Sequence, residues 1–131
     1  MPRQRTFTRT VWETTAGYCR AIRVGNHIYV SGTAPVNEQG GVFAPHDAYA
    51  QTKHCLAIIQ KALHDLGADI QDVVRTRLYV TDMQRWNEFA QAHQEYFGEH
   101  PPANTMVEIQ ALVDPAMLVE VEVEAVCDPD L

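Results

Sequence analysis

The sequence has no lysine or arginine after residue 85. All ten of its Lys and Arg side chains lie in residues 1–85, whereas residues 86–131 carry ten Asp and Glu side chains. The formal net charge of −7 argues against nucleic-acid binding, because such proteins need a basic face to displace counterions from phosphates. We expect the acidic C-terminal part to fold against the basic N-terminal part.

The sequence also lacks long apolar runs and the spacing of a cysteine framework, and we expect no secretory leader. No apolar stretch approaches the roughly 20 residues that a membrane helix needs. The basic N-terminus "MPRQRTFTRT" lacks the apolar stretch that follows in a secretory signal. The three cysteines are widely spaced, which excludes a Cys-x-x-Cys site and argues against disulfides. These absences predict a cytoplasmic protein with no membrane partner.

Motifs for metals, phosphates and nucleophilic serines are absent as well. None of the six histidines forms a His-x-x-x-His pair, and no Cys–His cluster has the spacing of metal ligands. The loop "NEQGG" lacks the spacing and the lysine of a phosphate loop. Ser31 has no Gly-x-Ser-x-Gly surroundings. The sequence therefore predicts no metal site and no nucleophilic serine.

The 131 residues do carry the pattern of a single α+β domain, spanning 1–131. Two alternating runs, "YCRAIRVG" and "HIYVSGTAP", flank Gly25-Asn26, which is typical of a tight hairpin turn. Helical spacing of apolar residues covers 47–67 and 81–98, and strand alternation covers 72–80, 105–113 and 117–127. The expected order is β-β-α-β-α-β-β, with "RTFTR" a candidate for a short first strand. One mixed sheet with both helices on the same face is the expected architecture.

The sheet face opposite the helices is predicted to be charged. In the last strand, one face holds Val119, Val121, Val123 and Ala125 and the other holds Glu120, Glu122 and Glu124. Arg75 and Arg77 fall on the charged face. Either this face is solvated and carries scattered ion pairs, or it packs on other copies of the chain. Within such an interface, Glu122 would orient or deprotonate a water molecule, or it would form a structural ion pair with Arg77 or Arg75.

Four stretches together resemble the RidA/YjgF family of reactive-intermediate deaminases. They are "GYCRAIRVGNHIYVSGTAPVN", "ADIQDVVRTRLYVTDMQRWNEF", "PPANTMVEI" and "LVDPAMLVEVEVEAV", within residues 17–126. The resemblance implies a chorismate-mutase-like fold and a homotrimer whose sheets form a central barrel, with small-molecule clefts between neighbouring subunits. It also implies hydrolysis of 2-imino acids or their enamine tautomers to 2-keto acids and ammonia, with no cofactor.

The same resemblance implies which residues line the cleft. Tyr18 matches the family's cleft tyrosine, Ser31 the serine of its "SG" turn, and Gly32 the glycine whose backbone approaches the ligand. Trp86 falls where the family often has an aromatic side chain. Met106 replaces a frequent cysteine whose backbone amide contacts the ligand.

Two further positions bear on the chemistry that the resemblance implies. Glu122 matches the carboxylate that positions the attacking water. Asn104 departs from the family, because the active branch has an arginine there that grips the substrate carboxylate through two charge-assisted hydrogen bonds. Loss of such a charged partner costs about 2–5 kcal/mol. Arg20 or Arg23, on a neighbouring strand, is a candidate replacement.

Two functions are compatible with these residues. The first is a homotrimeric deaminase-type hydrolase that acts on an imine or enamine, releases ammonia, and has a specificity changed from 2-imino acids. The second is a non-catalytic small-molecule-binding or regulatory protein that uses the same cleft. Ribonuclease activity, an older label of the family, fits poorly with the net charge of −7.

Overall fold

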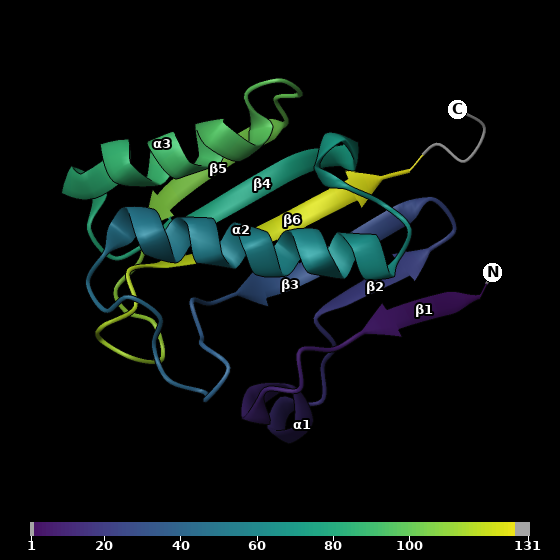
Figure 1. The fold of residues 1–131 in the computed structure, drawn as a ribbon, viewed down its shortest axis with the longest axis horizontal. Coiled ribbons are helices and arrows are strands. Elements are labelled where there is room, and N and C mark those ends of the chain that lie inside the picture. Colours follow the sequence, from purple (N-terminus) through teal and green to yellow (C-terminus); the bar gives the residue numbers. More distant parts are fainter. Residues whose placement is uncertain (1, 128–131) are drawn as a thin grey trace.

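A six-stranded mixed sheet forms the centre of the computed structural model, which describes residues 2–127 (Figure 1). The strands are β1 (Arg3–Thr6), β2 (Ala21–Val24), β3 (His27–Thr33), β4 (Val73–Val80), β5 (Ala103–Glu108) and β6 (Val119–Val126). Their order in the sheet is β1-β2-β3-β6-β4-β5. The β4–β5 pair is parallel and the other neighbours are antiparallel. This confirms the mixed α+β sheet expected from the sequence.

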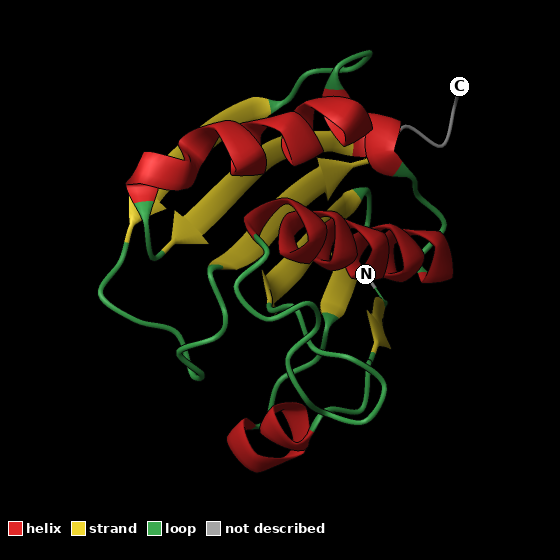
Figure 2. Cartoon of the chain, turned by 60° about the vertical axis from the view of Figure 1, so that its left-hand side comes forward, coloured by secondary structure: helices red, strands yellow, loops and turns green. Residues whose placement is uncertain are grey.

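Two long helices, α2 (Ala48–Asp65) and α3 (Trp86–Phe97), lie side by side on one face of the sheet (Figures 1 and 2). The prediction of both helices on one face is confirmed. Asp47 caps α2 through a hydrogen bond from Ala50 N, and Gly67 follows its end with a φ of 84°. The chain before α3 differs from the expectation: Asp82 caps a 3₁₀ turn, η2 (Met83–Arg85), which precedes the helix. A second 3₁₀ turn, η1 (Ile70–Asp72), leads into β4.

A third, short helix, α1 (Val11–Ala16), lies apart from the other two and was not predicted (Figure 1). Thr10 caps its start by accepting a hydrogen bond from Glu13 N, and Gly17 ends it with a φ of 80°. Its single buried residue is Glu13, so it has no apolar stripe that periodicity would detect. The first strand, β1, also begins earlier than the expected "RTFTR" segment.

The central strand β6 shows the expected two-residue alternation. Its buried side chains, in contact with the helical layer, are Val119, Val121, Val123 and Ala125. Its partly exposed side chains are Glu120, Glu122 and Glu124. In the register with β4, Arg77 lies opposite Glu122 and Tyr79 opposite Glu120. Strand β5 stops at Glu108, short of the predicted residue 113, because its partner β4 ends at Val80.

The other face of the sheet is uncovered in the single chain. Arg77 Nη1 lies 3.5 Å from Glu124 and 3.9 Å from Glu122, so the predicted Arg–Glu pairing forms within one chain. Tyr29 is 48% exposed and Val107 is 40% exposed. The face therefore mixes ion pairs with exposed apolar surface, and no helix of residues 2–127 covers it (Figure 2).

Three smaller findings bear on the classes excluded above. Within residues 2–127, no helix is long and apolar enough to cross a membrane. In the same part of the chain, no three His, Cys, Asp or Glu side chains gather as metal ligands do. Cys19, Cys55 and Cys127 are free thiols, as expected, and the last two are buried.

Candidate functional site

The structure divides the sequence-predicted site residues between two regions of the sheet. Tyr18 precedes β2, and Ser31 and Gly32 lie near the end of β3, which is the neighbour of β2. Asn104 and Met106 lie on β5, at the opposite edge of the sheet. The remaining two are Glu122, on the central strand β6, and Trp86, the first residue of α3.

The Glu120 carboxylate is packed against the backbone of Gly32. A Cβ at position 32 would overlap Glu120 Oε1, so only glycine allows this approach. Burial raises the pKa of Glu120, the positive charge of Arg20 opposes the shift, and the negative charge of Glu122 adds to it. Within residues 2–127, Glu120 has no hydrogen-bond partner. Its ionised form is therefore poorly stabilised, as is typical of functional carboxylates.

Arg20 is the cation beside this carboxylate, and it is only 4% exposed. Its Nη1 donates to Gly32 O at 2.8 Å and to Thr33 Oγ1 at 3.0 Å. Its Nε lies 3.5 Å from the buried carboxylate of Glu13, without hydrogen-bond geometry. Glu13 in turn accepts hydrogen bonds from the backbone N–H groups of Thr8 and Arg9. This buried pair ties α1 to the end of β3 and holds Gly32 in place.

Arg23, the other arginine expected as a candidate near Asn104, is hydrogen-bonded elsewhere. Arg23 donates to Gly25 O at 2.9 Å and to Leu66 O at 2.7 Å, so it caps the end of α2. Neither arginine lies near Asn104, because β2 and β5 are separated by three strands. Within one chain, therefore, neither Arg20 nor Arg23 supplies a guanidinium beside Asn104.

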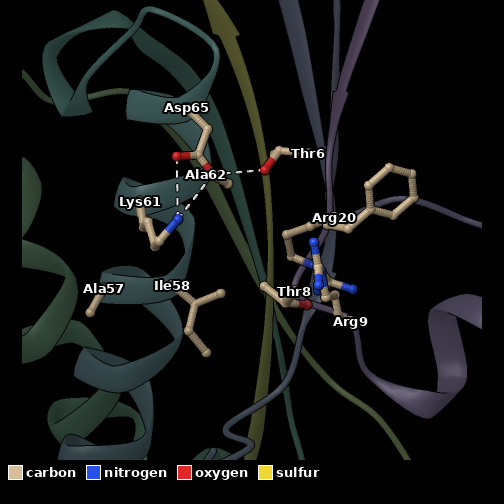
Figure 3. A pocket seen from close by; sticks show the side chains of 10 residues that line it. Thr6, Thr8, Arg9, Arg20, Ala57, Ile58, Lys61, Ala62 and Asp65 are labelled. Carbon is tan, nitrogen blue, oxygen red and sulfur yellow. Dashed lines mark hydrogen bonds and ion pairs between the residues drawn. The ribbon is translucent and has the colours of Figure 1, made fainter.

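A hollow of about 400 Å³ lies between α2 and the segment that joins β1 to α1 (Figure 3). Ala57, Ile58 and Ala62 form its α2 wall, where Lys61 pairs with Asp65 and Asp65 accepts from the Thr6 hydroxyl. Arg20 reaches its opposite side, but none of the sequence-predicted site residues lines it. A second hollow of about 340 Å³ is lined by Tyr18 together with Glu13 and three residues of the same region.

Glu122 is held by neighbours on the open face of the sheet. The Tyr79 hydroxyl donates to Glu122 Oε1 at 2.5 Å, and this bond raises the pKa of Tyr79. Arg77 Nη1 lies 3.9 Å from the other oxygen of Glu122. Of the two interpretations left open by the sequence, the contacts within one chain are those of the structural ion pair.

Asn104 lies on the opposite face from Glu122, toward the helices. Its Nδ2 donates to Thr76 Oγ1 at 2.9 Å, and that hydroxyl lies 2.8 Å from His93 Nε2. Thr76 is fully buried, whereas Asn104 is exposed. Burial lowers the pKa of His93, which favours its neutral form. An exposed amide on β5 is thus connected through β4 to a histidine on α3.

The two regions are too far apart to share a small ligand within one chain. From Glu120 to Asn104 there are two strand spacings across the sheet and three residues along it. At about 4.8 Å per strand and about 3.3 Å per residue, the separation is about 14 Å. A single site would need groups from a second copy.

The remaining predicted residues have structural contacts. The Ser31 hydroxyl donates to Cys19 O at 2.8 Å, so it ties β3 to the segment before β2 and is already hydrogen-bonded. Met106 is half-buried and packs against the core. The Trp86 side chain is 53% exposed and available to a partner or ligand.

Sequence reasoning missed Glu120, Thr76 and His93. Three glutamates alternate in "VEVEVEAV", so the alternation alone does not show which of them is a site residue. The register against Gly32, which only the fold provides, distinguishes Glu120 from the others. The connection of Thr76 to His93 and Asn104 joins three elements, and no spacing along the chain signals it.

Comparisons with known proteins agree with this fold. The chain matches the family Endoribonuclease L-PSP over residues 8–127. It is 35% identical over 106 residues to the 3-aminoacrylate deaminase RutC of Acinetobacter baylyi, covering 81% of this chain and 83% of that protein. A RutC family protein of Pyrococcus abyssi is 32% identical over 126 residues, with 96% and 97% covered. The crystal structure of Rv2704 from Mycobacterium tuberculosis, of the YjgF/YER057c/UK114 family, has a TM-score of 0.88 and 39% identity, with 96% and 100% covered.

The raised pKa of Glu120 predicts how Glu120→Gln changes stability. A carboxyl whose pKa is raised by folding destabilises the fold when it is ionised, and this cost vanishes below its ordinary value of 4.5. Glu120→Gln should therefore be more stable than the wild type near neutral pH, and the gain should decrease as the pH is lowered through the raised pKa and be absent below 4.5. Urea unfolding of both proteins near neutral pH and again below pH 4.5 measures the difference in the free energy of unfolding.

Glu122→Gln is the matched control. It weakens the 2.5 Å hydrogen bond from Tyr79, so it should give no gain in stability near neutral pH. Equal stabilisation by both variants would show that general relief of negative charge, and not the burial of Glu120, is responsible.

Proposed function

Because the chain belongs to the RidA/YjgF family, we propose that it hydrolyses an imine or enamine and releases ammonia. The observation that carries this proposal is the Glu120 carboxylate, which lies against Gly32 with a raised pKa. A carboxylate with these properties suits proton transfer to and from a reacting group. The 35% identity to a 3-aminoacrylate deaminase supports the same class of reaction.

The reaction needs a single proton shuttle. Water attacks the C=N carbon, a C–O bond forms, and the π electrons move to nitrogen. Glu120 takes the proton that water loses and gives it to the nitrogen, which leaves a carbinolamine. In the second step the same carboxyl moves the hydroxyl proton to the nitrogen, the C–N bond breaks, and the C=O bond forms. One water is consumed, and one ammonia leaves.

The resemblance assigned the water-positioning role to Glu122, and we propose that Glu120 fills it instead. Glu122 is bound by Tyr79 and faces Arg77, so its oxygens are engaged. Glu120 has no such partners within residues 2–127 and lies next to Gly32, the glycine expected at the ligand. Tyr18 lies on the same side, with its ring 5.6 Å from the Arg20 guanidinium carbon.

We propose that the site is completed by a second copy of the chain in a homotrimer. The separation of about 14 Å between Glu120 and Asn104 supports this, because a small ligand cannot touch both within one chain. The uncovered face of the sheet, with Tyr29 48% exposed and Val107 40% exposed, supports burial against other copies. In such an assembly, Asn104, Met106 and Trp86 of one copy would face Tyr18, Gly32 and Glu120 of the next. The three free cysteines fit a reducing, cytoplasmic location.

A non-catalytic binding or regulatory role is the alternative. It is favoured by Asn104, which offers no charge to a substrate carboxylate, and by Ser31 and Glu122, whose polar atoms are already bonded internally. Turnover of any imine that depends on Glu120 would distinguish the enzyme from the binding protein.

The first prediction about activity concerns Glu120 and Glu122. Imines without a carboxylate, made in situ from primary amines by an amine oxidase, are the substrates, and ammonia release is the readout. Glu120→Gln should lower kcat/KM by about 10²–10⁴-fold, the usual contribution of a general acid–base group. Glu122→Gln should lower it less than about tenfold, because it changes only the contacts of Glu122 with Tyr79 and Arg77 on the open face. A large loss in Glu122→Gln with little loss in Glu120→Gln would overturn the assignment.

The second prediction concerns Asn104. A 2-imino acid, made by an amino-acid oxidase, has a carboxylate that must lose water to enter the site. Without a cation to bind it, the free-energy cost of this desolvation is not offset. The wild type should hydrolyse such substrates weakly, and Asn104→Arg should raise kcat/KM by about tenfold or more. Semicarbazone trapping of the remaining imine measures the rate. Robust wild-type turnover of 2-iminopropanoate that vanishes in Glu120→Gln would show that another group binds the carboxylate.

A further inference from the structure

The side-chain amide of Asn104 has a fixed orientation. Its Nδ2 donates to Thr76 Oγ1 at 2.9 Å, so Oδ1 and the second N–H of this exposed residue are not used in that bond. Thr76 is fully buried, so its hydroxyl depends on protein groups for hydrogen bonds. The hydroxyl has one proton, and the amide of Asn104 already occupies one of its acceptor positions.

His93 is the candidate acceptor for the Thr76 hydroxyl proton. His93 Nε2 lies 2.8 Å from Thr76 Oγ1, and its ring packs on Phe97 with ring centroids 4.6 Å apart. Burial lowers the pKa of His93, so the neutral ring offers one unprotonated nitrogen as an acceptor. If Thr76 donates its proton to Nε2, the buried hydroxyl has both a donor and an acceptor partner within this group. The resulting chain runs in one direction, from Asn104 through Thr76 to His93.

We propose that this chain makes Asn104 present its carbonyl oxygen and one N–H to the ligand, so that the site selects a C=N substrate bearing a carboxamide or ureido group. The proposal rests on the function proposed above for the place of Asn104 in the ligand site. An amide offers an N–H to Oδ1 and a C=O to the remaining N–H of Asn104, which gives two parallel hydrogen bonds. A carboxylate only accepts, so one of its oxygens would face Oδ1 without a proton between them.

In this scheme, His93 is a positioning residue and never touches the ligand. Without an acceptor at position 93, the Thr76 hydroxyl is free to donate to Asn104 Oδ1. The amide then turns over and presents its NH₂ group outward. The choice between amide and carboxylate is thus set from the far side of β4, by a residue on α3.

The test is a binding measurement, so it does not depend on turnover. Pyruvamide and pyruvate are stable carbonyl analogues that differ only in the amide and the carboxylate. Each is titrated into ¹⁵N-labelled protein while the side-chain NH₂ signals of Asn104 are followed, and the two Kd values are compared. Wild-type protein should bind pyruvamide about tenfold more tightly than pyruvate, as expected for one well-made hydrogen bond.

Variants separate the network from a general effect on structure. Thr76→Val and His93→Leu should reduce the preference to less than about threefold, because the amide is no longer held in one orientation. His93→Gln should retain it, since the glutamine carbonyl can accept from Thr76. Thr52→Val is the control, because Thr52 is equally buried but donates to Ala48 O within α2. It should leave the preference unchanged.

Each contrary result is informative. A wild type that binds pyruvate as tightly as pyruvamide, or binds neither, overturns the proposal. An unchanged preference in Thr76→Val overturns the role of the network. A clear preference for the amide together with no ammonia release from any imine would leave the ligand class standing and refute the proposed hydrolysis.

Discussion

The two-residue alternation of β6 is the constraint on which the rest of the structure depends. Every second side chain, from Val119 to Ala125, is buried beneath the helices, and this fixes the register of the strand against β3 and β4. The intervening glutamates must then lie on the other face. A slip of one residue would bury three carboxylates, so the position of Glu120 beside Gly32 follows directly from the packing of the valines.

Local patterns of this kind made much of the fold predictable from the sequence. The valines and glutamates of β6, the hairpin at Gly25 and the apolar stripes of α2 and α3 are local patterns, and each was found where it was expected. Helix α1 was missed because it has no apolar stripe. The roles of Glu120 and His93 were missed for another reason: they depend on contacts between elements that are distant in sequence, and no local pattern encodes them.

The polar groups fall into two environments with different consequences. Glu120 is partly buried and lacks a hydrogen bond within residues 2–127, so its pKa is raised. A carboxyl with a raised pKa is suited to proton transfer. The Arg20–Glu13 ion pair and the Tyr79–Glu122 hydrogen bond, by contrast, place each charged group beside a partner within the chain. At the β5 edge, the neutral amide of Asn104 is hydrogen-bonded to Thr76, and under the proposed function it is this amide that meets the ligand.

The proposed function has one requirement, which is that other copies of the chain cover the open face of the sheet and bring Asn104 toward Glu120. The solution mass tests this most directly. Light scattering at micromolar protein concentration should give three times the chain mass of 14.8 kDa. A mass of 14.8 kDa under the same conditions would mean that the open face is solvated and that Glu120 and Asn104 do not share a ligand. That result would contradict the account.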